Sequence, residues 1–159
     1  MATKKPLVLG NDGRIEQLQS GDNLANVGGD NIATLTNGNA GAAIICEVVY
    51  ATNTADTFDK AQANASGTVE AIGLVADTAI AASAVGSVQA GGTFTATTAQ
   101  WDAVTGGSGG LTPGTKYFLS EATAGQLSTT APSTGFVKAI GTALSTTDLL
   151  LQFEPRIKL

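Results

Sequence analysis

The chain has 159 residues, which suits one ordinary domain, and 43% of them are hydrophobic but only 5% aromatic. Its core must therefore be built mainly from Val, Ile, Leu and Ala. With 8 Lys and Arg against 13 Asp and Glu, the net charge is −5, and no basic stripe is present that would bind nucleic acid. The low charged fraction, 13%, suits either a surface given over to other subunits or an isolated neutral β-domain.

Catalytic chemistry has few candidate residues. The sequence contains no histidine, which removes the usual general base and the commonest metal ligand. Its only cysteine, Cys46, lies in an apolar run, so we expect a small buried hydrophobe and not a nucleophile. The carboxylates show neither a calcium-loop pattern nor a clear glycosidase pair. We therefore expect no enzyme activity, no catalytic residue, no metal site and no cofactor.

Targeting signals are also missing from the sequence. The opening Met1–Leu9 contains a proline and lacks the apolar segment of a signal peptide. No apolar run approaches the ~20 residues that span a membrane. We expect a soluble chain made in the cytoplasm, with no membrane partner.

The first predicted elements are a hairpin and an arm. Leu7–Leu9 and Arg14–Leu18 flank Gly10-Asn11-Asp12-Gly13, and Asp-Gly between two short β-type runs is a strong hairpin signal. Ser20–Gly41 is rich in Gly and Asn, which is typical of an extended arm. We assign residues 1–41 to this hairpin and arm. Because a two-stranded hairpin is marginal alone, we expect it to pack on another surface.

The body, residues 42–159, shows short β-type runs separated by Gly-, Ser- and Thr-rich turns. The predicted strands are Ile44–Ala51, Thr68–Val75, Ser87–Thr95, Thr115–Ser120, Phe136–Leu144 and Asp148–Glu154. Thr98–Val104 predicts one short helix, capped by Thr97 or Thr98 and ended by the Gly106–Gly110 run. Asp56–Ala65 favours a helix or loop, and Ala76–Ala84 is ambiguous. The fold class is all-β: a small antiparallel β-barrel or β-sandwich with an N-terminal hairpin and extended arm and one short helix.

A faint repeat runs through the body. Gly67-Thr-Val-Glu-Ala-Ile-Gly73 matches Gly135-Phe-Val-Lys-Ala-Ile-Gly141 at an offset of 68 positions, and Val49-Tyr50 falls on Tyr117-Phe118 at the same offset. Two copies of a hairpin-like unit that complete one barrel or sandwich would explain both matches. The glycine after each isoleucine permits a bulge or a close backbone approach. Coincidence between strands of low complexity is the alternative.

The remaining notable residues favour structural roles. Trp101, the only tryptophan, is more often a packing residue than an anchor for a sugar or a partner. Lys4 and Lys5, and likewise Arg156 and Lys158, form small basic spots, for which solvated tails are favoured over ion pairs with acidic neighbours in an assembly. The glycine-rich stretches lack the Lys-Ser/Thr ending of a phosphate loop and indicate turns.

Three stretches resemble virion proteins of tailed bacteriophages. The first, Lys5–Asp22, is similar to the start of many phage head-decoration and fibre proteins. The second runs from Thr98 to Leu111-Thr-Pro-Gly-Thr-Lys-Tyr-Phe-Leu-Ser120. The third runs from Gly125-Gln-Leu-Ser to Phe136-Val-Lys-Ala-Ile-Gly-Thr-Ala-Leu-Ser145. Leu-Thr-Pro-Gly followed by an aromatic strand and Gly-x-Leu-Ser is the most specific part.

This resemblance implies a capsid decoration (cement) protein: β-rich, commonly trimeric, and bound to the outside of the capsid, where it braces joints between hexamers of the major coat protein. The virion is then its location, after assembly in the host bacterial cytoplasm. The hairpin and arm are the natural parts to reach neighbouring subunits. The expected partner-binding residues are therefore Lys4, Lys5, Leu7, Leu9, Arg14, Ile15, Leu18 and Leu24.

Two other functions stay open at this point. A tail-fibre, head-fibre or baseplate module has a similar start, but such modules are usually fused to long fibrous or receptor-binding segments. A carbohydrate-binding module would need several aromatic side chains on one exposed face, and the sequence offers only one Trp, 2 Tyr and 5 Phe.

Overall fold

The computed structural model describes residues 7–9, 15–17 and 31–159. The chain divides into two compact units, Met1–Asp30 and Asn31–Leu159. In the first unit, β1 (Leu7–Leu9) pairs antiparallel with β2 (Ile15–Gln17), and Leu9 lies opposite Ile15. These are the two strands of the expected hairpin, and the predicted turn between them lies outside the described residues.

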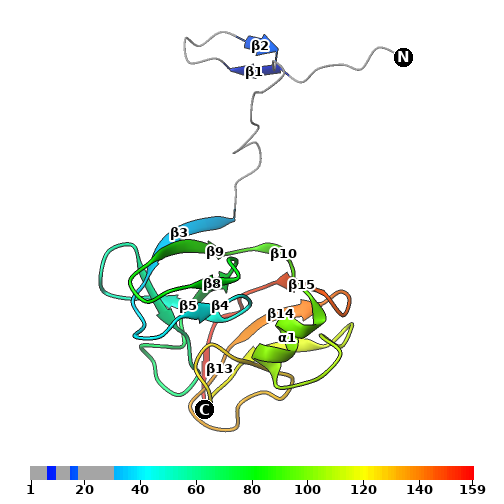
Figure 1. Cartoon of the computed structure of the whole chain (residues 1–159). Helices are drawn as coiled ribbons and strands as arrows, with labels where there is room; N and C mark the ends of the chain where they lie inside the picture. The colour runs from blue at the N-terminus through cyan, green and yellow to red at the C-terminus, as the bar shows by residue number, and fades with distance from the viewer. Residues whose placement is uncertain (1–6, 10–14, 18–30) are drawn as a thin grey trace. The chain divides into compact units, whose positions relative to one another are not determined.

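The second unit is mostly β-structure with one helix, as the fold class predicted (Figure 1). Its elements are β3 (Ile32–Asn37), β4 (Ala43–Ile44), β5 (Val48–Ala51), β6 (Thr57–Lys60), β7 (Ala71–Val75), β8 (Ala79–Ile80), β9 (Val85–Gln89), β10 (Gly92–Thr95), α1 (Thr98–Thr105), β11 (Lys116–Leu119), β12 (Leu127–Ser128), β13 (Phe136–Val137), β14 (Ala139–Ala143), β15 (Asp148–Leu151) and β16 (Ile157–Lys158).

The first half of this unit is a closed barrel. Its strands follow the order β3-β6-β5-β7-β9, and β9 pairs with β3 to close the ring. All the pairs are antiparallel except β3 with β6, where Thr36 lies opposite Thr57 in a parallel register. A small core of Val49, Phe58 and Val88 with Ala43, Val75 and Ile80 belongs to this half.

The second half is an open five-stranded sheet, β10-β15-β14-β11-β12. Its two end strands do not pair with each other, and α1 lies against β12. The helix begins as predicted, because Thr97 and Gln100 form a reciprocal capping box, and it ends at Gly106 in the left-handed conformation. Trp101 of the helix packs edge-to-face on Phe94 of β10, with ring centroids 5.6 Å apart. The helix therefore bridges the side on which the sheet is open.

The two halves have the same topology. We call β3, β5, β6, β7 and β9 the first repeat, and β10, β11, β12, β14 and β15 the second repeat. Numbered along the chain within each repeat, the strands of both occur in the spatial order 1-5-4-2-3. The repeated unit is thus a five-stranded sheet, larger than the hairpin-like unit that the sequence matches suggested.

The registers agree residue by residue. In both repeats, the second and fourth strands pair with a one-residue bulge at the same place. The paired positions are Val49–Gly73 and Tyr50–Ala71 in the first repeat, and Tyr117–Gly141 and Phe118–Ala139 in the second. Every one of these positions is related to its counterpart by the offset of 68 found in the sequence.

The turn before the second strand is repeated as well. In each repeat, the backbone N–H of the last turn residue donates to the carbonyl three positions earlier and closes a four-residue turn. The N–H of the residue just before it donates to the last residue of the fourth strand of the repeat, β7 or β14. These bonds run from Glu47 N to Ile44 O (3.2 Å) and Cys46 N to Val75 O (3.0 Å), and from Thr115 N to Thr112 O (3.1 Å) and Gly114 N to Ala143 O (2.8 Å). Both Cys46 and Gly114 have positive φ, 71° and 76°. The Thr-Pro-Gly motif of the second repeat therefore has a structural counterpart in the first.

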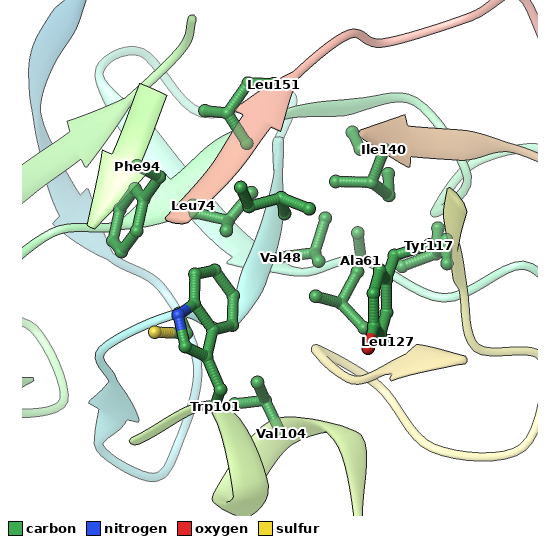
Figure 2. Close-up of a cluster of buried hydrophobic side chains, with 14 of the residues drawn as sticks. Val48, Ala61, Leu74, Phe94, Trp101, Val104, Tyr117, Leu127, Ile140 and Leu151 are labelled. Carbon is green, nitrogen blue, oxygen red and sulfur yellow. The ribbon is translucent and has the colours of Figure 1, made fainter. Parts of the chain in front are cut away.

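The two repeats share one core. Side chains from both, among them Val48 and Leu74 from the first and Ile140 and Leu151 from the second, gather in one buried cluster (Figure 2). Backbone bonds also join the repeats: Gly125 N donates to Ala61 O at 2.7 Å. Because Val48 N donates to Gly125 O at 2.9 Å, this glycine sits between two segments of the first repeat. Residues 31–159 are therefore one folding unit.

Some of the predicted boundaries were wrong. The arm does not extend to Gly41, because Ile32–Asn37 forms β3 and pairs with the barrel strand β9, with Ala33 and Leu35 half-buried. The body therefore begins at Asn31 and not at Ala42. Thr57–Lys60, within the segment predicted as helix or loop, is β6, since Phe58 is buried in the barrel.

Three predicted strands are each split in two. A tight turn separates β4 from β5, the bend at Ala90–Gly91 separates β9 from β10, and Lys138 separates β13 from β14. The last predicted strand ends at Leu151 instead of Glu154.

Candidate interaction surfaces

Most carboxylates of the second unit hold the backbone in place. Asp102 on α1 accepts hydrogen bonds from the amides of Gly109 (3.0 Å) and Gly110 (2.8 Å), which fixes the glycine-rich loop after the helix. Asp77 accepts from the amide of Ser87 at 2.8 Å. These oxygen atoms are engaged by local donors and do not converge on a common point.

Asp148 stabilises the tight turn between β14 and β15 through side-chain hydroxyls. Hydrogen bonds from the hydroxyls of Ser145 (2.7 Å) and Thr95 (2.6 Å) lower the pKa of its carboxyl below the usual value. The same carboxylate thus ties the turn to β10. A hydrogen-bonded carboxylate of lowered pKa stays ionised and is a poor general base.

A small ion network joins equivalent positions of the two repeats. Glu70 and Lys138 are counterparts at the offset of 68, and Lys138 Nζ lies 3.8 Å from a Glu70 oxygen. Arg156 also pairs with Glu70, donates to Ser66 O at 3.0 Å and lies over the ring of Phe136. The sequence favoured a solvated tail for Arg156, and this prediction was wrong: the guanidinium clamps the C-terminal segment to the body.

Cys46 and Trp101 have the structural roles that the sequence favoured. Cys46 is fully buried, and burial raises the pKa of its thiol to about 12, so it is protonated at neutral pH. Trp101 is fully buried, and its Nε1 donates to Thr147 O at 2.9 Å. Neither side chain is available to a substrate or sugar.

The described residues hold no cluster of three or more His, Cys, Asp or Glu that would suit a metal ion. In the same part of the chain, no helix has the length and apolar character needed to cross a membrane. A hollow of about 430 Å³ lies beside the first repeat between Leu35, Ile72 and the hairpin loop at Thr52–Asp56. It has no cluster of titratable groups, and Asp56 is its only charged residue.

Of the eight residues expected to bind a partner, Lys4, Lys5, Arg14, Leu18 and Leu24 lie outside the described residues. The structure places the backbone of Leu7 and Leu9 on β1 and that of Ile15 on β2. It brings these three together in one strand pair, and their role in binding stays a prediction.

The sequence interpretation missed an exposed apolar segment at the other end of the chain. Ile157 and Leu159 are 62% and 58% exposed, and Ile157 belongs to β16, whose one partner among the described strands is β13. The alternation Arg-Ile-Lys-Leu at 156–159 is a strand signal that the basic residues obscured. This edge strand is the clearest candidate interaction surface on the described part of the body.

Comparison with known proteins adds no assignment: no family model matches the chain, and neither a curated protein nor a solved structure matches it.

Proposed function

We propose that the chain is a structural protein of a tailed-phage virion, specifically a capsid decoration protein that binds the outer surface of the major coat lattice. The observation that carries this proposal is the use of polar side chains in the body. Asp77, Asp102 and Asp148 secure turns and loops, while Glu70 and Arg156 clamp segments together. Such a body suits a mechanical role better than a chemical one.

The resemblance to phage proteins supports the same role. Its most specific motif, Leu111-Thr-Pro-Gly with the strand that follows, forms a turn and the inner strand β11 of the second repeat. The Gly-x-Leu-Ser motif forms β12 and places Gly125 between segments of the first repeat. The motifs that carry the resemblance are thus structural parts of the duplicated body: one forms a turn and a strand, and the other contacts the first repeat.

The proposed mechanism is multivalent bracing. Three copies assemble as a trimer over a joint between capsomers, each with a rigid duplicated body and an N-terminal unit that carries Leu7, Leu9 and Ile15. Once one contact forms, the others become intramolecular, so effective concentration strengthens attachment without any single strong bond. The lattice then resists internal pressure because its joints are closed from outside.

A binding and melting experiment tests this role. Purified protein is mixed with expanded shells of the coat protein encoded in the same genome, prepared without any decoration protein. We expect saturable binding in multiples of three and a higher melting temperature of the shells. Shells that bind no protein, or that bind it and melt unchanged, contradict the proposal.

The nearest competing role is a module of a tail fibre, head fibre or baseplate. Gene neighbourhood separates the two, since a position beside the coat gene favours decoration and a position among tail genes favours a fibre. A carbohydrate-binding role loses its strongest candidate residue, because Trp101 is buried and bonded to Thr147.

A further inference from the structure

The strand β16 lies outside the duplicated scaffold. Both repeats are complete at the end of β15, and β16 has no counterpart in the first repeat. It is nevertheless held in place: Phe136 and Val137 of β13 pair with it, and Arg156 anchors the segment before β16 to Glu70 and Ser66. A segment that contributes no buried side chain to the core and yet is clamped to the body suggests a role at the surface.

The outer edge of β16 has free backbone groups. Ile157 lies opposite Val137, and Leu159 N donates to Gly135 O at 3.1 Å. Alternate residues of an antiparallel strand direct their backbone groups to the same neighbour, so Lys158 directs its N–H and C=O away from β13. Phe136 lies opposite Lys158 as a non-hydrogen-bonded pair, and no backbone bond joins Lys158 to a turn or loop within residues 31–159. Unpaired strand edges of this kind template the addition of another strand.

The side chains define what fits this edge. Ile157 and Leu159 point to one face and are more than half exposed, while the Lys158 ammonium has no carboxylate partner within residues 31–159. An incoming strand gains most if it carries a carboxylate opposite Lys158 and apolar side chains beside Ile157 and Leu159.

A second copy of the same edge does not satisfy these conditions. The residues whose backbone groups point outward are Lys158 and, two positions earlier, Arg156. An antiparallel pair of two β16 edges therefore sets Lys158 against Lys158, Lys158 against Arg156, or Arg156 against Arg156. Like charges directly opposite destabilise a strand pair.

We propose that the outer edge of β16 pairs with an extended strand of the major coat protein that is apolar and carries an acidic residue opposite Lys158. This inference rests on the proposed decoration function and names the surface through which the body, as distinct from the N-terminal unit, attaches. Main-chain hydrogen bonds give the affinity, and Lys158 sets the register.

Two variants of the full-length protein test the edge. Lys158→Pro removes the outward N–H together with the side-chain ammonium and leaves the bonds of Ile157 and Leu159 to β13, so it blocks an incoming strand without disrupting the ribbon. A double variant, Ile157→Ser with Leu159→Ser, removes the apolar contacts. Leu144→Ser is the matched control, since Leu144 is 56% exposed and lies in the turn between β14 and β15, outside β16. Melting temperatures verify that every variant is folded.

We expect both edge variants to bind expanded coat shells at least about tenfold more weakly than the wild type, which corresponds to ~1.4 kcal/mol, while Leu144→Ser binds normally. Edge variants that are folded and bind as tightly as the wild type overturn the inference and leave the decoration function standing. Wild-type protein that binds no shell overturns both. Self-association of the free protein that Lys158→Pro abolishes would show that a second copy, not the coat protein, occupies the edge.

Discussion

The two repeats share one strand order, but the first closes into a barrel and the second stays an open sheet. In the first repeat, the end strands β3 and β6 meet in parallel and close a barrel. In the second repeat, the corresponding strands β10 and β12 do not meet, and the helix α1 lies in the connection that follows β10. The first repeat instead has a longer loop between β7 and β9, and its β8 pairs with β4. The five equivalent strands set the topology of both repeats. The segments that differ, α1 in the second repeat and β4 with β8 in the first, determine how the sheet of each repeat is covered or closed.

This comparison predicts that the second repeat depends on its helix. Trp101→Ala removes the fully buried indole that contacts Phe94 and leaves a cavity in the shared core. We expect a loss of about 4 kcal/mol in the free energy of unfolding, measured by urea denaturation. Trp101→Phe is the control: it keeps an aromatic ring but loses the hydrogen bond to Thr147, and we expect a smaller loss of ~1–2 kcal/mol. A loss below about 1 kcal/mol for Trp101→Ala would show that the helix does not seal the repeat.

The second prediction tests whether the repeats are equivalent where their strands coincide. A Cβ on Gly73 would lie 2.6 Å from Gln89 O, and a Cβ on Gly141 would lie even closer to Leu150 O. Because both obstacles are backbone atoms, we expect Gly73→Ala and Gly141→Ala to cost about 3 kcal/mol each. Gly67→Ala is the matched control, since its Cβ meets nothing within 4 Å. If one of the two variants melts at the temperature of the wild type, positions 73 and 141 are not structurally equivalent.

The third prediction concerns a feature of the first repeat alone. Asn37 ends β3 fully buried, and its side-chain amide donates to Ile80 O (2.9 Å) and Gly41 O (3.0 Å). Its Oδ1 accepts from Asn39 N at 2.9 Å. Asn37→Ala leaves these backbone groups unsatisfied, so we expect a loss of about 2 kcal/mol.

Hydrogen exchange should locate the Asn37→Ala effect in β3, β8 and the adjoining turns, and leave the second repeat protected. Asn53→Ala, in an exposed loop, serves as the control and should change stability by less than about 0.5 kcal/mol. Equal loss of protection in both repeats would mean that Asn37 acts on the whole unit.

The sequence was informative where signals are local. Thr97 and Gln100 with Gly106 mark the ends of α1, and the Val-x-Ala-Ile-Gly matches locate the duplicated strand pair. The strand β3 was missed because its alternating Ile32-Ala-Thr-Leu-Thr lies in a segment dominated by Gly and Asn. The strand β6 has one buried apolar residue, Phe58, and its pairing with β3 comes from barrel closure. Closure depends on contacts between distant segments, which short patterns do not encode.

The candidate surface shows the same limit. The basic residues at 156 and 158 suggested one solvated tail, yet they have different environments. Arg156 has an ion-pair partner in Glu70, which lies far from it in the sequence, and Lys158 has none within residues 31–159. No property of the segment itself distinguishes the two residues.

The last prediction compares one turn position in the two repeats and has the smallest expected effect. Cys46 and Gly114 occupy this position, with φ of 71° and 76°. A left-handed backbone costs a residue with a side chain ~1–2 kcal/mol, so Gly114→Ala, whose Cβ meets nothing within 4 Å, should cost about 1 kcal/mol. In Cys46→Gly, relief of this strain opposes the loss of a buried thiol, and we expect a net change within about 1 kcal/mol.

The thiol adds a pH dependence that only the first repeat has. Burial raises the pKa of the thiol in the folded protein to about 12, above its ordinary value of 9.0, so the unfolded chain loses the proton first as pH rises. Cys46 therefore lowers stability between these two values, and Cys46→Gly should flatten that part of a stability–pH curve measured by denaturation. Native protein should also resist thiol reagents at neutral pH and react once unfolded. Rapid labelling of the native protein would mean that the turn at Cys46 opens readily. The turns at Cys46 and Gly114 would then share their backbone geometry but differ in how easily they open.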